Sequence, residues 1–264
     1  IRTFLKHPSK DLNHRSANPP IIRASTILFN SMQELYQHEK KIKKHQKISH
    51  YSYGRYGSST TIELENILKE LEQAYHVFLT GTGFGGIALA LMSLCRPGDE
   101  ILVSDNVYGP TKEISQDLMK EFNIYAKFYN PDSFKDLKKK ISKKTKAIMP
   151  VHIYGQPCRL DEIIQIAKLK KIYVIEDAAE ALGGTYKGKK IGLSGDCACF
   201  SFYANKIITT GEGGMAVFKK KKNSKTASLI KNHGMSSKEF YYHTIAGSNY
   251  RMTNPQAAIG LAQL

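Results

Sequence analysis

The regular alternation of strand-like and helix-like segments after residue 58 is the feature that most constrains the fold. Apolar runs of strand length lie at 76–80, 100–104, 124–129, 146–151, 172–175, 197–203 and 214–218. Segments with helical periodicity lie between and after them, near 88–94, 111–121, 133–142, 160–170, 225–232 and 254–264. This alternation predicts an α/β fold with a mostly parallel central sheet and helices on both faces.

The residues before this alternation differ in character. Residues 1–58 are polar, with Pro19-Pro20 and a stretch rich in lysine and histidine, and we expect an extended N-terminal arm followed by a short helix. Residues 59–264 are expected to form one large domain. Its first helix is predicted to open at the capping box formed by Thr60 and Glu63.

A glycine-rich turn, TGTGFGG, follows the strand at 76–80 and precedes a helix. Glycine lets a backbone approach a ligand closely, and free N–H groups at the start of a helix bind phosphate. Gly81, Gly83 and Gly86 also match the dinucleotide fingerprint, with Asp105 at the end of the next strand for the ribose. The turn therefore predicts a phosphate site, of a nicotinamide enzyme or of another class, unless it is a tight turn without a ligand.

Two more strand ends carry charge at the edge where such sheets bind ligands. Asp177 could keep a pyridinium nitrogen protonated, or it could cap a following helix. Lys206 could form a Schiff base if it is removed from water, or it could be one more surface lysine. A dehydrogenase would leave both residues without a role. A pyridoxal phosphate enzyme would use them together with the glycine turn and with Tyr108 stacked on the ring, so the sequence favours pyridoxal phosphate as the cofactor.

Composition narrows the partners. Seven arginines leave 32 of the 39 basic residues as lysine, and the net charge is +16. Proteins that read nucleic acids depend on arginine, so we expect a solvated lysine-rich surface and no nucleic-acid partner. The four cysteines form no CxxC pair, which predicts no metal site and a reducing cytoplasm. No apolar run approaches the ~18 residues of a membrane span, so no membrane partner is predicted.

The second half of the chain, about residues 146–264, resembles the pyridoxal-phosphate-dependent sugar aminotransferases of the DegT/StrS type. Five segments carry the resemblance: 150–157 (PVHIYGQP), 175–181 (IEDAAEA), 199–206 (CFSFYANK), 211–214 (GEGG) and 249–254 (NYRMTN). They are most similar to the perosamine-type synthases, which aminate a keto group on a nucleotide-linked deoxysugar.

The resemblance implies a role for each matching residue. Lys206 would hold the cofactor as a Schiff base and move the proton, while Asp177 would bind the pyridinium. Glu180 would lie above the ring, where His or Gln is frequent in this family. Ser201 would bind the phosphate, and Asn249 would reach the phosphate of the neighbouring subunit. Without that resemblance, Ser201 is a satisfied strand hydroxyl and Asn249 is a loop cap.

The first part, about residues 15–147, resembles instead a cystathionine β-lyase of the Cys/Met-metabolism family of pyridoxal phosphate enzymes, with a change of family near 145–150. The segments are 18–26 (NPPIIRAST), 53–57 (YGRYG) and 103–111 (VSDNVYGPT). This resemblance implies that Tyr53 and Arg55 reach across a dimer to the other subunit's phosphate; the alternative is a surface aromatic–cation pair. The residues that it assigns to the phosphate loop and to ring stacking are Thr82, Gly83, Phe84 and Tyr108.

Both resemblances imply the large-domain fold of the aminotransferases and a homodimer whose active site is shared between subunits. The C-terminal small domain of both families is not found, so we expect a truncated chain. The predicted reaction is the transfer of an amino group from glutamate to a nucleotide-linked keto-deoxysugar. The alternatives are a C–S lyase acting on cystathionine and an inactive fragment with the same fold.

Overall fold

The computed structural model describes residues 21, 26–44, 48, 50–236, 239 and 241–264. Its centre is a seven-stranded sheet with the strand order β1-β9-β8-β5-β4-β2-β3. The strands are β1 (His76–Thr80), β2 (Glu100–Ser104), β3 (Tyr125–Tyr129), β4 (Thr145–Met149), β5 (Tyr173–Asp177), β8 (Cys197–Ser201) and β9 (Gly214–Phe218). Strand β9 runs antiparallel to its neighbours β1 and β8, and the other pairs are parallel. The predicted α/β fold with a mostly parallel sheet is confirmed.

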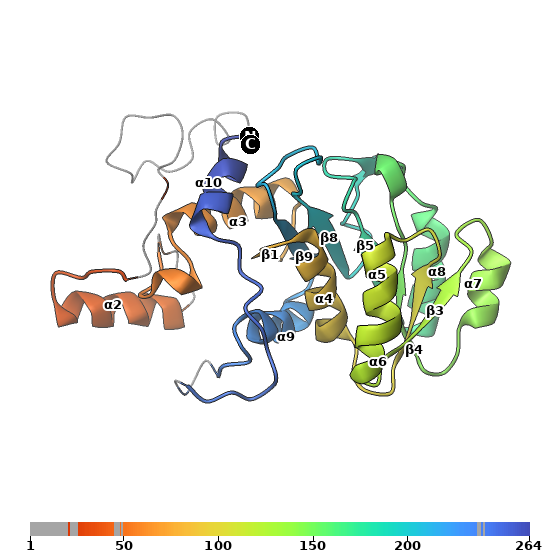
Figure 1. Cartoon of the computed structure of the whole chain (residues 1–264), viewed down its shortest axis with the longest axis horizontal. Helices are drawn as coiled ribbons and strands as arrows, with labels where there is room; N and C mark the ends of the chain where they lie inside the picture. The colour runs from red at the N-terminus through yellow and green to blue at the C-terminus, as the bar shows by residue number, and fades with distance from the viewer. Residues whose placement is uncertain (1–20, 22–25, 45–47, 49, 237–238, 240) are drawn as a thin grey trace.

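Helices cover both faces of this sheet (Figure 1). One face packs against α4 (Gly83–Leu94), α9 (Lys221–Lys231) and a continuous helical stretch made of α5 (Gly109–Glu113), the π-helical turn η2 (Ile114–Leu118) and α6 (Met119–Glu121). On the other face, α3 (Ser59–Leu71) and α10 (Asn254–Leu261) cover β1, β8 and β9. Helices α7 (Phe134–Lys140) and α8 (Leu160–Lys170) cover β2, β4 and β5.

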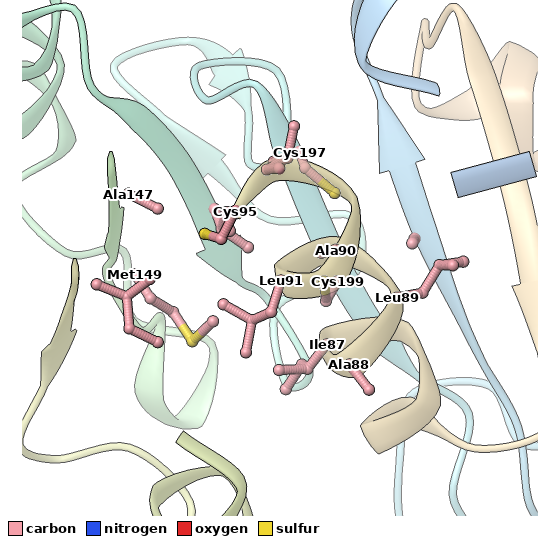
Figure 2. Packing of buried hydrophobic residues seen from close by; sticks show 14 of the residues in the cluster. Ile87, Ala88, Leu89, Ala90, Leu91, Cys95, Ala147, Met149, Cys197 and Cys199 are labelled. Atoms are coloured by element: carbon pink, nitrogen blue, oxygen red, sulfur yellow. The ribbon is translucent and has the colours of Figure 1, made fainter. Parts of the chain in front are cut away.

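The alternation of side chains along β8 shows how one strand serves both layers. Cys197 and Cys199 point toward α4, whereas Ala198 and Phe200 point toward α3 and α10. Successive residues of a strand face opposite sides of the sheet, so a strand that is covered by helices on both faces is apolar at successive positions and not at alternate ones. Figure 2 shows Cys197 and Cys199 close to the apolar side chains of α4.

Helix α4 is buried on nearly every side, which its sequence GFGGIALALMSL permits because it contains no charge. Its Leu89 and Leu91 are fully buried. The helix packs against β8 and β9 as well as α9, and the side chain of its N-cap, Thr82, accepts a hydrogen bond from the amide of Gly85 at 2.9 Å. A buried helix thus begins directly at the glycine-rich turn.

Some sequence predictions need correction. The capping box of α3 is formed by Ser58 and Thr61 and not by Thr60 and Glu63, because the helix begins at Ser59. A small hairpin of β6 (Thr185–Tyr186) and β7 (Lys189–Lys190) was not predicted. It carries no run of apolar residues by which it could have been recognised.

The predicted N-terminal arm lies largely outside the described residues. Within the described part, the short helix of the arm is α2 (Met32–Lys43), which extends away from the body of the molecule (left in Figure 1), and η1 (Gly54–Tyr56) follows it. No helix among the described residues is long and apolar enough to cross a membrane.

Candidate active site

The carboxyl ends of β1, β5 and β8 lie at one edge of the sheet, and the antiparallel strand β9 begins there. Thr80 and Ser201, the last residues of β1 and β8, both pair with Gly214, the first residue of β9. Asp177, the last residue of β5, pairs with Cys199 of β8. The glycine turn, Asp177 and the segment leading to Lys206 therefore leave the sheet at the same edge, as the sequence predicts.

Lys206 is held close to this edge. Its side chain is 18% exposed, whereas those of Lys187 and Lys220 are 67% and 70% exposed. The Nζ atom of Lys206 lies 3.2 Å from Oε1 of Glu180. Lys206 is thus less exposed than these two lysines, but Lys231 is only 14% exposed, so the role of Lys206 as the Schiff-base residue stays a prediction.

Glu180 is held from two sides. Its Oε2 accepts a hydrogen bond of 2.6 Å from the amide of Tyr154, and its Oε1 faces Lys206. Burial raises the pKa of the Glu180 carboxyl, but the Tyr154 amide and the Lys206 ammonium outweigh it and leave the pKa below its usual value. The carboxylate is therefore negatively charged at neutral pH, and it fixes the direction of the lysine.

Asp177 is 4% exposed. Burial raises the pKa of its carboxyl to about 6, although the amide of Ala179 and the charge of Lys206 act in the opposite direction. Within the described part of the chain, no basic side chain lies within 4 Å of this carboxylate. The alternative that Asp177 caps a helix is not found. Its Oδ1 accepts a hydrogen bond from the amide of Ala179 at 3.2 Å, as a cap would, but the residues that follow form a turn and not a helix.

Gly83, Ser201 and Gly214 form a close contact at the start of α4. A Cβ atom on Gly83 would lie 2.7 Å from Oγ of Ser201, and a Cβ atom on Gly214 would lie 2.5 Å from Cα of Gly83. Only glycine permits this approach, because real Cβ atoms do not come closer than about 3 Å to such neighbours. The Ser201 hydroxyl accepts from the amide of Tyr203 at 3.3 Å. The contact brings the first turn of α4 and a serine hydroxyl together, which suits an anionic group.

Two aromatic residues predicted for the site are exposed to solvent. Phe84, in the first turn of α4, is 39% exposed, and Tyr108, at the N-cap of α5, is 69% exposed. Tyr108 leaves the sheet after β2, which is separated from β5 by β4. In the described residues no ring contact or hydrogen bond joins Tyr108 to Asp177 or Lys206, so its stacking role stays a prediction.

Tyr53, Arg55 and Asn249 come together in a second group. The guanidinium carbon of Arg55 lies 5.1 Å from the centre of the Tyr53 ring, which is the aromatic–cation pair that the sequence left open. Arg55 and Arg251 both contact the Tyr56 ring, with their guanidinium carbons 5.5 Å and 5.1 Å from its centre. Nη1 of Arg251 also donates to Oδ1 of Asn249 at 3.4 Å, so Arg251 connects the pair to Asn249.

Arg251 is the member of this second group that the sequence reasoning missed. Burial and the nearby charge of Arg55 lower the pKa of Arg251 to about 10. Its carbonyl oxygen would lie 3.4 Å from a Cβ atom on Gly81, so the group borders the glycine turn. Arg251 lies in the segment 249–254 (NYRMTN), one of those that carry the family resemblance, but the sequence analysis assigns a role only to its Asn249.

The sheet order excludes the dinucleotide-binding alternative. That motif needs the glycine turn and the acidic residue on neighbouring strands of one βαβ unit. Here β9, β8, β5 and β4 lie between β1, which precedes the turn, and β2, which precedes Asp105. Asp105 is therefore far along the sheet from Gly81 and Gly83.

Comparison with known proteins identifies the family. The model of the DegT/DnrJ/EryC1/StrS aminotransferase family matches residues 36–264. GDP-perosamine synthase of Caulobacter vibrioides is 42% identical over 214 residues, 77% of this chain and 56% of that protein. GDP-perosamine synthase of Escherichia coli O157:H7 is 41% identical over 209 residues, 76% and 56% of the two chains. The chain thus spans about half the length of the curated relatives that it matches.

Solved structures agree on the fold. The aminotransferase from Psychrobacter cryohalolentis superimposes with a TM-score of 0.70 at 27% identity, covering 92% of this chain and 63% of the other.

The comparisons do not support the resemblance of residues 15–147 to cystathionine β-lyase, because the family match begins at residue 36 and includes most of that part. The chain belongs to the DegT/DnrJ/EryC1/StrS aminotransferase family.

Proposed function

We propose that this chain binds pyridoxal phosphate through Lys206 and takes part in transferring an amino group from glutamate to a keto-deoxysugar linked to a nucleotide. The observation that carries the proposal is the pair of charged residues on neighbouring strands: Lys206 follows β8 and Asp177 ends β5. Aminotransferase chemistry requires an amine and a carboxylate in this relation, and membership of the family supports it.

The residues present fit the cofactor. A buried carboxylate without a basic partner in the described chain, Asp177, suits a protonated ring nitrogen, since a positive charge at this point would offset the cost of burial. The contact of Gly83, Ser201 and Gly214 brings the first turn of α4 and a hydroxyl together at the same end of the sheet as Asp177. Thr82 and Phe84 belong to the same turn, and Tyr108 is the aromatic residue proposed to cover the ring.

Pyridoxal phosphate would supply an aldehyde and an electron-withdrawing ring that stabilises negative charge at the carbon next to the substrate nitrogen. Asp177 would keep the ring nitrogen protonated. Lys206 would first bind the aldehyde and later move a proton from the donor amino acid. Glu180 is proposed to hold Lys206 in position by accepting a hydrogen bond from its Nζ atom.

The substrate class comes from the relatives. Two of them are named GDP-perosamine synthases, and we propose that this chain belongs to an enzyme that aminates a nucleotide-linked sugar in the same way. The excess of lysine, with a net charge of +16, would attract the diphosphate of such a substrate.

The organisation of the protein is proposed on the same basis. Residues 1–58 would form an arm and 59–264 the cofactor domain, in a homodimer in which Tyr53, Arg55 and Asn249 face the partner's phosphate. Within one subunit these three residues border the glycine turn through Arg251 and are not joined to Lys206 by any described contact. The four free cysteines suit the cytoplasm that we propose as location.

The test is the visible absorption of the protein after incubation with pyridoxal phosphate and gel filtration. Wild type should retain a yellow band, Lys206→Ala should lose it, and Lys220→Ala, which removes a solvated lysine, should keep it. Addition of glutamate should then bleach the band. Absence of a retained band in wild type would overturn the proposal, and a band that Lys206→Ala keeps would overturn the assignment of the lysine.

A further inference from the structure

A buried polar pair that the proposed function does not use lies directly behind the site. The side chains of His152 and Glu176 are both 0% exposed, and Nε2 of His152 lies 3.1 Å from Oε2 of Glu176. Glu176 precedes Asp177 on β5, and so it points to the opposite face of the sheet. Burying such groups is costly unless each polar atom is bonded, so the arrangement of the bonds matters.

The hydrogen bonds determine the state of the His152 ring. A carboxylate only accepts, so Nε2 carries the hydrogen that faces Glu176. The amide of Cys158 only donates, and it lies 3.3 Å from Nδ1, so Nδ1 carries none. The ring is therefore neutral, with its hydrogen on Nε2, an assignment that follows from its partners. Both nitrogens are engaged, and the ring links β5 to the turn at 152–158.

Glu176 is fixed by a loop built around it. Its Oε2 also accepts from the amide of Gly192 at 2.9 Å, and its Oε1 accepts from the amide of Gly195 at 2.5 Å. A Cβ atom on Gly195 would lie 2.7 Å from the carbonyl oxygen of Val174 and 3.0 Å from Oε1 of Glu176. Only glycine lets this amide reach the carboxylate, and three donors therefore hold Glu176 in one orientation.

The first connection to the site runs through the backbone of Asp177. The amide of His152 donates to the carbonyl of Asp177 at 3.0 Å, and the amide of Asp177 donates to the carbonyl of Pro150 at 2.9 Å. Because Glu176 and Asp177 are neighbours on one strand, the bonds to Glu176 and to the Asp177 backbone together hold the stretch of strand from which the Asp177 side chain leaves on the other face.

The second connection runs through the turn that His152 closes by its bond to Cys158. Tyr154 lies in this turn in a left-handed conformation, with φ of 51°. Its amide donates to Oε2 of Glu180 at 2.6 Å, and Oε1 of Glu180 faces Lys206 at 3.2 Å. A left-handed tyrosine is strained, so the turn needs ties at both ends to present this amide.

We infer that His152 is a positioning residue. Paired with Glu176, it sets the directions of Asp177 through the strand and of Glu180 through the turn, and thereby the orientation of the pyridoxal phosphate ring between them. The inference rests on the proposed function for the identity of the cofactor. His152 itself does not touch Lys206 through any described bond.

Two substitutions separate the connections. In His152→Gln, the amide can still donate to Glu176 from the position of Nε2, but the acceptor for Cys158 is lost. In His152→Asn, an acceptor remains near the position of Nδ1, but the donor to Glu176 is lost. Glu176→Gln keeps the shape of the side chain but replaces one of its two acceptor oxygens by an NH2 group, so the three donors around it are no longer all satisfied. This variant tests the inference if the His152 variants do not fold.

The control is a buried carboxylate at the opposite edge of the sheet. Glu72 is 3% exposed and follows α3, close to where β1 begins. Glu72→Gln should change the stability of the protein without changing the site.

The measurements are the circular dichroism of the visible cofactor band, the dissociation constant of pyridoxal phosphate and the melting temperature. We expect an altered dichroism and about tenfold weaker binding for the His152 and Glu176 variants, and neither for Glu72→Gln. Folded His152 variants with native dichroism and affinity would overturn the inference, as would an equal change in Glu72→Gln. A wild type without any cofactor band would instead overturn the proposed function on which the inference rests.

Discussion

Gly83 and Ser201 touch across the ends of two strands that are more than a hundred residues apart in the chain, and a Cβ atom on Gly83 would lie 2.7 Å from Oγ of Ser201. Gly83→Ala should therefore push α4 away from β8. We expect a loss of about 1–3 kcal/mol in the free energy of unfolding, which is typical of overpacking, together with weaker binding of pyridoxal phosphate.

Gly109→Ala is the matched control for this substitution. Gly109 is also the first residue of a helix, but a Cβ atom there would meet nothing within 4 Å. Urea unfolding and titration with pyridoxal phosphate should leave this variant close to wild type. Equal losses in both variants would mean that the contact with Ser201 is not the cause.

The raised pKa of Asp177 makes stability depend on pH. Its pKa is about 6 in the folded protein, against 3.8 as the ordinary value. Between these values the folded state binds more protons than the unfolded state, so this residue makes the cofactor-free protein less stable as the pH rises from about 4 to 6. Asp177→Asn should remove this slope and raise the free energy of unfolding at pH 8 by about 1–3 kcal/mol.

The same substitution should weaken the binding of pyridoxal phosphate. Unfolding at pH 5 and pH 8, measured with and without the cofactor, checks both effects. A cofactor-free Asp177→Asn variant that is less stable than wild type at pH 8 would contradict the assignment.

Glu180 should show the opposite dependence, because its pKa is lowered. A carboxyl of this kind contributes stability above its unfolded pKa and loses it as the pH falls through the folded pKa. The pair with Lys206 is partly exposed, so Glu180→Gln should cost less than about 1 kcal/mol at pH 7, and the difference from wild type should shrink toward pH 4. Thermal unfolding of the cofactor-free proteins measures this difference.

Arg55 and Arg251 repel each other, since the charge of Arg55 contributes to the lowered pKa of Arg251. Salt screens such repulsion over about 10 Å at 0.1 M. Arg55→Gln should therefore raise the melting temperature at low salt, and less so at high salt, whereas Arg55→Lys should behave like wild type. A lower melting temperature of Arg55→Gln at low salt would show that the contacts of Arg55 with Tyr53 and Tyr56 outweigh the repulsion.

The sequence predicted the strands well because their apolar runs are short and clearly bounded: 76–80, 100–104 and 214–218 match β1, β2 and β9. It placed the capping box of α3 too late because Ser58, Ser59, Thr60 and Thr61 follow one another at the start of that helix, and local patterns do not choose among them. Lys206 and Asp177 stand out in the sequence because Asp177 ends one apolar strand and Lys206 follows another, and their roles stay proposals.

The remainder of the site depends on tertiary contacts that leave little trace in the sequence. Gly83 faces Ser201, and Tyr154 reaches Glu180, only because the strands are ordered as they are. Arg251 was overlooked because a half-buried arginine has no periodic signature in the sequence. The dinucleotide alternative could be rejected only with the strand order in hand, because the spacing of Gly81, Gly83 and Asp105 satisfies the motif within the sequence alone.

The antiparallel strand β9 also has a consequence for how the protein is made. Among the described strands, β1 pairs with β9 alone, and its His76 pairs with Phe218. During synthesis β1 therefore emerges long before the strand that it needs, and it presents unpaired N–H and C=O groups to other chains in the meantime. We expect nascent chains that stop before residue 214 to aggregate and to bind chaperones. Strands β1 and β8, which carry the glycine turn and lead to Lys206, would then be joined last, when β9 has been synthesised and pairs with both.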